Sequence, residues 1–344
     1  MAAAVVRPEP LGPPCATHRP TLVDLGRIPE REARRLPDAP AWAPPPRDGV
    51  GASRVGVGAG HFPALLDFLV ARFPAVHDWP ARLACGDVLD ASGRPLAADA
   101  PCVSGMVLWY WRNPPPEPRV PFEIELLHRD DHLVVVDKPH FLSAIPGGRH
   151  LHETVLVRLK RQLGIDTLAP MHRLDRDTAG VLVFTVQPAT RHAYQSLLRD
   201  RQVHKVYEAI AAWRADLALP LLCCSRLEQR NGAAFMQTQV VPGEPNAETK
   251  VELIGRVGPS GTLAHYRLTP HTGRRHQLRA QLSALGLPIV GDRIYPRLLP
   301  EPAPEAAPDY SQPLQLLARE FSFIDPISGQ QRRFISQRRL LWTP

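Results

Sequence analysis

The sequence predicts an α+β fold in which helices flank a largely antiparallel, mixed sheet. From about residue 120 onward, β-branched apolar runs alternate with amphipathic helical segments, without the strict β–α–β order of a doubly wound parallel sheet. The glycine-rich loops of nucleotide-binding folds are also missing. "GVGAG" at 56–60 would need a third glycine where His61 stands, and we expect no strand before it.

Composition divides the chain into three parts. Residues 1–50 hold 11 of the 39 prolines and are predicted to form a disordered or loosely packed arm. Residues 51–119 form a smaller α/β element that ends in the stiff linker "NPPPEPR" (113–119), and the sequence leaves its role open. Residues 120–344 form the main domain, a division that suits a chain of 344 residues.

The expected elements follow from local patterns. In the small element, "FPALLDFLVARF" (62–73) is typical of a helix and "MVLWYW" (106–111) of a strand. In the main domain, β-branched runs predict strands and leucines that recur on one side predict helices. The strands are expected at 131–139, 181–186, 204–213, 265–270 and near 321–326, and the helices at 148–164, 190–202 and 273–286. Gly164 and Gly286 mark two helix ends, and Thr190 is the expected N-cap of the middle helix.

Charge and cysteine content narrow the class of protein. A net charge of +7 and a pI near 9.5 favour a polyanionic partner such as nucleic acid, although ordinary surface chemistry explains a basic pI equally well. Five cysteines without a C-x-x-C pair argue against a zinc site and against a disulfide framework. His150 and His152 have no third ligand at metal spacing, so we expect no metal. No apolar run approaches the roughly 20 residues that span a bilayer, so a soluble, cytoplasmic protein is expected.

The decapeptide "MHRLDRDTAG" (171–180) sets alternating charges directly before the apolar run "VLVFTV". A solvated loop of mutually satisfied charges is the simplest interpretation of such a segment. If the segment is extended, however, Arg173, Asp175 and Asp177 point to one side and Leu174 to the other. A carboxylate held beside a guanidinium keeps a low pKa and stays ionised, which suits nucleophilic or electrostatic catalysis.

Two further segments carry candidate functional residues. In "TGRRHQLRAQLSALG" (272–286), Arg279 lies at the edge of an apolar helical stripe, where it could reach a partly buried anion. RNA phosphates and an internal carboxylate such as Asp175 are both suitable anions. In "HKVYEAI" (204–210), Lys205 and Tyr207 share one side of a strand, where core packing is the usual fate of a tyrosine.

Taken in order, "MHRLDRDTAGVLVFT", "HKVYEAIA" and "HTGRRHQLRAQLSALGLPIVGDRIY" resemble the RluA-type pseudouridine synthases of ribosomal and transfer RNA. The resemblance covers roughly residues 125–340, and "HRLDRDTAG" is its most specific element. Arg275 stands where the family usually has Thr or Ser, a change that adds charge and leaves the flanking residues in place. The part before Val120 resembles the family much less.

The resemblance implies a reaction and a set of roles. A uridine in RNA becomes pseudouridine without a cofactor, and the target base is flipped out of the stack. Asp175 is the implied catalytic carboxylate and Arg279 its basic partner. Tyr207 is the implied base-stacking residue and a candidate acceptor of the C5 proton, and Arg173 fills the gap that the flipped nucleotide leaves. Arg274 is a lesser candidate for phosphate contact; the enzyme is expected to act as a monomer on ribosomal or transfer RNA.

Two rival hypotheses use the same residues. The first is an RNA-binding protein that keeps the fold but lacks turnover, although such a protein would be free to lose Asp175, Tyr207 and Arg279. The second is a glycoside hydrolase with Asp175 and Asp177 as its carboxylate pair, roughly 7 Å apart on one strand face. Against it, Asp177 lies beside Arg176, and nothing indicates the raised pKa that a general acid requires.

Overall fold

The computed structural model describes residues 42–60, 62–112, 117–148, 150–230, 237–300 and 306–343. Most of the predicted arm lies outside these residues. Two compact units divide at Pro115 and Pro116. Among the described residues, no helix is both long enough and apolar enough to cross a bilayer.

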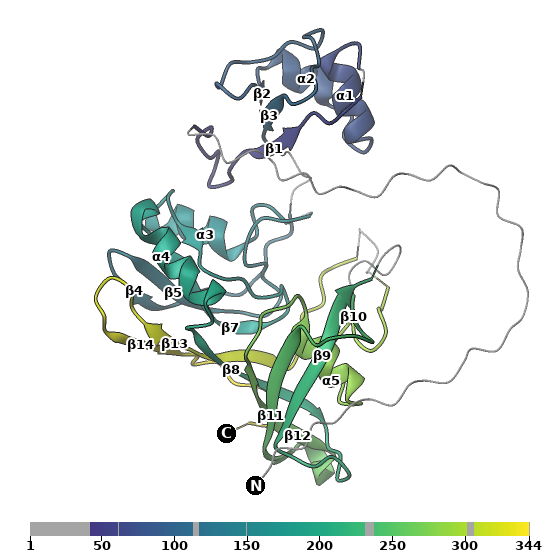
Figure 1. The fold of residues 1–344 in the computed structure, drawn as a ribbon, viewed down its shortest axis with the longest axis vertical. Helices are drawn as coiled ribbons and strands as arrows, with labels where there is room; N and C mark the ends of the chain where they lie inside the picture. Colours follow the sequence, from purple (N-terminus) through teal and green to yellow (C-terminus); the bar gives the residue numbers. More distant parts are fainter. Residues whose placement is uncertain are drawn as a thin grey trace, which may run out of the picture. The chain divides into compact units, whose positions relative to one another are not determined.

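The N-terminal unit is a three-stranded antiparallel sheet with two helices (Figure 1). Its elements are β1 (Ser53–Gly56), α1 (Leu65–Arg72), α2 (Trp79–Ala84), β2 (Val88–Leu89) and β3 (Val107–Tyr110). Trp79 and Leu65 are fully buried in its core. β1 ends at Gly56, the first residue of "GVGAG", so the expectation that no strand precedes this segment was wrong. Arg54 and Val55 pair with β3, and the local sequence pattern does not reveal this pairing.

The C-terminal unit is built on one large sheet (Figure 1). Its strands run in the order β10-β9-β11-β12-β8-β13-β7-β5-β4, with β14 beside β13 and β6 beside β7. The bounds are β4 (Glu125–Arg129), β5 (Leu133–Lys138), β6 (Ala169–Pro170), β7 (Ala179–Thr185), β8 (His204–Ala212), β9 (Leu221–Gln229), β10 (Thr238–Val241), β11 (Ala247–Val257), β12 (Leu263–Pro270), β13 (Leu316–Ile324) and β14 (Gln331–Ile335). Among the described strands only the β13–β7 pairing is parallel, so the predicted α+β fold on a largely antiparallel mixed sheet is confirmed.

The continuous apolar runs of β5 and β7 are explained by helices on both faces. Val134, Val136, Leu182 and Phe184 pack with α3 (Val155–Leu163) in one cluster. The alternate residues Leu133, Val135, Val181 and Val183 pack with α4 (Pro188–Arg199) in another. A strand covered on both sides has no polar face, because successive side chains point to opposite faces.

The helices begin at other residues than the pattern predicts. α3 begins at Val155 rather than near 148, because the Thr154 side chain accepts a hydrogen bond from the Val157 amide (3.3 Å) and caps it; Gly164 ends it in the left-handed conformation, as expected. α4 has Gln187 as its N-cap, so the assignment of Thr190 was wrong. Pro188 starts that helix earlier, since proline is already fixed in a helical φ and needs no amide partner there.

A third helix, α5 (Gln277–Ala284), covers the other half of the sheet beside β9 and β10 (Figure 1). Leu278 and Leu282 pack in a core cluster with strands β8, β9, β11 and β12. Because the helix begins at Gln277, Arg274 and Arg275 lie in the loop before it and not on its face. Tyr207 on β8 packs against both this cluster and the α3 cluster, so it marks the place where the two halves of the domain meet.

Gly180 is the one position of "HRLDRDTAG" whose residue type the backbone requires. Its φ is +111°, and an added Cβ would lie 2.2 Å from the carbonyl oxygen of Ala318 in the adjacent parallel strand. We expect Gly180→Ala to lower the free energy of unfolding by about 3 kcal/mol, from overpacking and left-handed strain together. Urea denaturation measures this loss. Gly329→Ala is the matched control, since φ there is +71° and the space is open; an equal loss in both variants would contradict the clash.

Candidate active site

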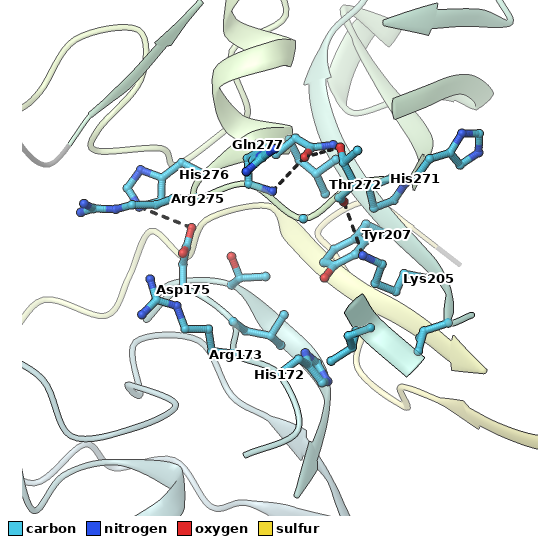
Figure 2. A pocket seen from close by; sticks show the side chains of 18 of the residues that line it. His172, Arg173, Asp175, Lys205, Tyr207, His271, Thr272, Arg275, His276 and Gln277 are labelled. Atoms are coloured by element: carbon cyan, nitrogen blue, oxygen red, sulfur yellow. Dashed lines mark hydrogen bonds and ion pairs between the residues drawn. The ribbon is translucent and has the colours of Figure 1, made fainter. Parts of the chain in front are cut away.

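A cavity of about 500 Å³ opens in the C-terminal unit, where four segments converge. Figure 2 shows residues of three of them, the loop after Met171, strand β8 and the loop before α5; the fourth is the end of α4. Asp175 is the one carboxylate among the described residues that line it. Seven cationic side chains share the lining: Arg173, Arg199, Arg201, Lys205, Arg274, Arg275 and Arg279. A cavity with one carboxylate and a strong excess of positive charge attracts a polyanionic substrate.

The loop that carries Asp175 is held from both sides. Leu174 is buried in the α3 cluster, and the Thr178 amide donates to the Asp175 carbonyl (3.2 Å) to close a turn. Beneath the loop, the fully buried Lys138 donates from Nζ to the carbonyls of Pro139, Leu142 and Arg176 (2.9, 2.7 and 2.8 Å). Burial lowers the pKa of Lys138 to about 7, but three carbonyl acceptors match the three protons of its charged form. Lys138 therefore fixes the backbone directly after Asp175.

Arg279 joins Asp175 to a second carboxylate. Its Nη1 donates to Asp175 Oδ2 (3.0 Å), while Nε and Nη2 donate to the two oxygens of Asp292 (2.8 and 2.7 Å). The Arg279 side chain is 2% exposed and that of Asp292 is fully buried. Asp292 neutralises Arg279 and orients it, so the guanidinium can present one edge to Asp175 without losing its own partner.

The Asp175 side chain is 29% exposed toward the cavity. Burial by itself would raise its pKa. The charge that His276 takes up at acid pH, the charge of Arg279 and the Arg279 hydrogen bond outweigh burial and hold the pKa below its usual value. His276 Nε2 lies 3.7 Å from Asp175 Oδ2. Burial lowers the pKa of His276, so its ring is neutral at neutral pH and Arg279 supplies the lasting positive charge.

Tyr207 and Lys205 form the floor of the cavity, both from β8 (Figure 2). Burial, and next the charge of Asp175, raise the pKa of Tyr207 well above its ordinary value, so its phenol stays protonated. Burial lowers the pKa of Lys205, whose Nζ donates to the Thr272 carbonyl (3.4 Å). The aromatic ring beside a carboxylate and an ammonium group offers a flat surface with polar groups at its edge.

The two other arginines predicted to contact RNA lie toward the outside of the cavity. Arg173 is exposed and lies next to Asp175 (Figure 2). Arg274 is also exposed, and it donates from Nε to the Asn246 carbonyl (3.0 Å), which anchors the loop before α5. The structure therefore brings Arg173, Asp175, Tyr207 and Arg279 to one cavity, with Arg274 on its wall.

Asp177 is not among the residues that line this cavity. Its carboxylate accepts from Arg176 Nε (3.1 Å), and the turn at residues 176–177 interrupts the extended backbone. The expectation that Arg173, Asp175 and Asp177 share one side was wrong for this reason, because alternation holds only along a strand. The carboxylate pair of the hydrolase hypothesis therefore has no geometric support.

No group of three or more His, Cys, Asp or Glu side chains in the described ranges is arranged to hold a metal ion. Cys85, Cys102, Cys223 and Cys224 are free thiols. The sequence patterns assigned no role to Asp292, Lys138, Tyr295 or His276. The sequence does contain a signal for two of them: Asp292 stands in "PIVGDRIY", and Lys138 ends a buried apolar strand. A charged side chain in such a place requires a buried partner.

Comparison with known proteins identifies the class. The RNA pseudouridylate synthase family matches residues 132–284. The dual-specificity RNA pseudouridine synthase RluA of Haemophilus influenzae is 33% identical over 229 residues, which cover 64% of this chain and 94% of that protein. An uncharacterised RNA pseudouridine synthase of Synechocystis is 30% identical over 238 residues, 67% of this chain and 79% of its own length. The structure of human RNA pseudouridylate synthase domain containing 1 has the same fold, with a TM-score of 0.51 at 19% identity over 65% of this chain and 86% of that one.

The fold and the matches together define an isomerase that acts on RNA. Within that class, the chain belongs to the RluA-type RNA pseudouridine synthase family. The resemblance seen in the sequence is confirmed, and the hypothesis of a binding protein without turnover is set aside.

Proposed function

We propose that this enzyme converts specific uridines of ribosomal or transfer RNA to pseudouridine, with Asp175 as the catalytic carboxylate and the target base flipped into the cavity. The supporting observation is that Asp175 is an ionised carboxylate in a basic cavity, held by a buried arginine and beside a tyrosine ring. A duplex or stacked strand hides the glycosidic bond, so the nucleotide has to leave the stack before a carboxylate inside the cavity can reach it.

The chemistry needs one ionised carboxylate. Uracil leaves with the glycosidic electron pair and spreads its charge over an imide, so it needs less protonation than a sugar alkoxide does. Asp175 either attacks C1′ to give a covalent glycosyl intermediate or removes the C2′ proton to give a glycal. In both routes the base turns and C5 bonds to C1′; Asp175 leaves C1′ in the covalent route and returns the proton to C2′ in the glycal route. The C5 proton is then lost to solvent and N1 takes up a proton, so the product is an isomer of the substrate and no cofactor is consumed.

The floor of the cavity suits the flipped base. We assign Tyr207 as the ring on which uracil stacks, since base–aromatic stacking tolerates the rotation of the base. Its raised pKa favours this role over that of the base that removes the C5 proton, because burial, and next the charge of Asp175, disfavour a phenolate. Arg279 positions Asp175, and Arg274 is a phosphate contact on the wall.

Release of tritium from RNA that carries 5-tritiated uridine tests the proposed function. Wild-type enzyme is expected to release tritium from unmodified ribosomal or transfer RNA transcripts and to leave the chain intact. Free uracil or an abasic product would instead indicate hydrolysis, and binding without release would indicate that the cavity does not catalyse the reaction.

The low pKa of Asp175 predicts a flat acid side of the pH–rate profile. Because its folded-state pKa lies below the ordinary value of about 4, the carboxylate stays ionised as the pH falls from about 8 to about 5. The single-turnover rate is therefore expected to stay constant over this range. An acid limb with a midpoint near pH 6 would contradict this assignment, since it would require a group with a much higher pKa to be deprotonated.

Arg173 is proposed to fill the gap that the flipped nucleotide leaves. A planar guanidinium stacks and binds phosphate, whereas an ammonium supplies charge alone. We expect Arg173→Lys to lower the single-turnover rate about 10-fold and Arg173→Ala about 100-fold, because unstacking costs a few kcal/mol. Arg199→Lys is the control, since its guanidinium is paired with Asp200 (2.8 Å). Full activity of Arg173→Lys would show that Arg173 contributes only charge.

The organisation of the whole chain is also part of the proposal. We propose an arm over residues 1–50, a small unit over 51–119 and the catalytic domain over 120–344, acting as a monomer in the cytoplasm. Residues 42–112 contain six arginines and six aspartates and no lysine or glutamate. This part has no formal net charge, so it adds no general attraction for RNA phosphates.

A further inference from the structure

His276 lies between the candidate catalytic carboxylate and a buried tyrosine. Its Nε2 is 3.7 Å from Asp175 Oδ2, and its Nδ1 is 3.2 Å from the Tyr295 hydroxyl (Figure 2 shows the side toward Asp175). The residue is the N-cap of α5 but has a left-handed backbone, with φ 52° and ψ 22°. A non-glycine residue in this conformation is strained, and such strain clusters at functional sites.

The hydrogen bonds fix which ring nitrogen carries the proton. The Thr238 amide donates to the Tyr295 hydroxyl (2.6 Å), and an amide nitrogen cannot accept in return. Thr238 Oγ1 is buried but forms no hydrogen bond with any described residue, so it does not take the hydroxyl proton, which is directed to His276 Nδ1 as the acceptor. Burial lowers the pKa of His276 and raises that of Tyr295, so the ring has one proton and the phenol keeps its own. That ring proton is on Nε2, toward Asp175.

The partners of His276 are themselves fixed by the arginine site. Asp292, which holds Arg279, also accepts from the backbone amides of Ile294 and Tyr295 (2.8 and 3.0 Å). The Arg279 guanidinium lies 5.6 Å from the centre of the Tyr295 ring. Asp175, Arg279, Asp292, Tyr295 and His276 thus form a closed ring of contacts, in which each side chain is positioned from two directions.

Both of the basic side chains that contact Asp175 face the same carboxylate oxygen. Arg279 Nη1 donates to Oδ2, and His276 Nε2 faces Oδ2 as well. Among the described residues, none forms a hydrogen bond or ion pair with Oδ1. A carboxylate held in this way presents one oxygen whose lone pairs are not engaged by the protein.

We infer that His276 is a positioning residue for Asp175: Tyr295 fixes its Nε2–H tautomer, and His276 and Arg279 together hold Oδ2 so that Oδ1 is the oxygen that acts on the ribose. The inference rests on the proposed role of Asp175. It goes further in naming the reacting oxygen, the tautomer and the residue that sets it.

The test compares three variants in single-turnover assays on unmodified, 5-tritiated ribosomal and transfer RNA transcripts. His276→Asn removes the group that faces Asp175, because the asparagine amide reaches only the place of Nδ1. His276→Gln restores an N–H donor near the place of Nε2, and Tyr295→Phe keeps the ring but frees the tautomer. We expect the rate to fall about 30-fold in His276→Asn, about 10-fold in Tyr295→Phe and less than about 5-fold in His276→Gln, with the Kd for RNA unchanged, because small misplacements of a reacting group cost this much.

A nitrogen-15 spectrum of histidine-labelled wild-type enzyme gives a second, independent result. A protonated Nε2 and an unprotonated Nδ1 for His276 support the inference, and the reverse tautomer overturns it. This result comes from the wild type, so it decides the question even if His276→Asn does not fold. A rate within about twofold of wild type in both His276→Asn and Tyr295→Phe overturns it as well. Asp175→Asn, assayed alongside, separates the two proposals: if that variant turns over, the proposed function fails, and if it is inactive while His276→Asn is fully active, only the positioning role fails.

Discussion

Asp175→Asn is expected to abolish pseudouridine formation and to lower the single-turnover rate by at least about 10⁴-fold, as the loss of an essential catalytic group does in other enzymes. The asparagine keeps the shape of the side chain and an oxygen that can accept from Arg279 Nη1, but it has no negative charge with which to act on the sugar. Tritium release and mapping of modified positions measure the loss.

The same variant is expected to fold and to bind RNA as the wild type does. Asp292 still neutralises Arg279, so no buried charge is left without a partner. Removing one negative charge from a cavity lined by seven cationic side chains does not weaken its attraction for phosphate. Filter binding at fixed salt measures the Kd, and a large rise in the Kd would indicate a structural role for Asp175 instead.

Asp177→Asn is the matched control, because it makes the same chemical change two residues away. Asp177 does not line the cavity and pairs with the partly exposed Arg176. Its substitution is expected to leave the rate within about twofold of wild type, since a pair of this kind contributes little. Equal losses in the two variants would revive the hypothesis of a carboxylate pair.

The class and position of the main elements could be predicted because they depend on local pattern. Runs such as "LVVV" in β5 and "VLVF" in β7 can only be satisfied by burial on both faces, and both strands are buried throughout. The leucine stripe of α5 likewise placed Arg279 at the edge of the apolar face, from which it reaches Asp175. In these cases the periodicity alone determines which side chains face inward.

The hydrophobic pattern of the sequence could not predict contacts between distant segments. Asp292 follows Arg279 by 13 residues in a loop, and Lys138 contacts the Arg176 carbonyl across 38 residues. Neither contact leaves a periodic signal, because a turn or a strand pairing brings the residues together. The same limitation explains the error at Asp177: a single turn at 176–177 changes which side chains share a face, and no local propensity fixes that turn.

Asp292→Ala is expected to cause the largest loss of stability among these variants. It removes both acceptors of Arg279 Nε and Nη2 and leaves the guanidinium, 2% exposed, without its main counter-charge. Breaking a buried pair by removing one partner costs about 3–5 kcal/mol of unfolding free energy. The active site is affected as well, because Arg279 can then turn toward Asp175, and the amides of Ile294 and Tyr295 lose the one Asp292 oxygen that accepts from both of them.

Two comparisons make this prediction specific. Asp292→Asn keeps an acceptor for the amides of Ile294 and Tyr295 but removes the charge. It is therefore expected to lose less stability than Asp292→Ala does, but to lose about as much activity. Asp216→Ala breaks the exposed pair with Arg214 and is expected to leave the urea midpoint unchanged, because solvent screens such a pair. If Asp292→Ala is as stable as Asp216→Ala, then Arg279 does not depend on Asp292, and the orientation of Asp175 has to come from the loop and Lys138 alone.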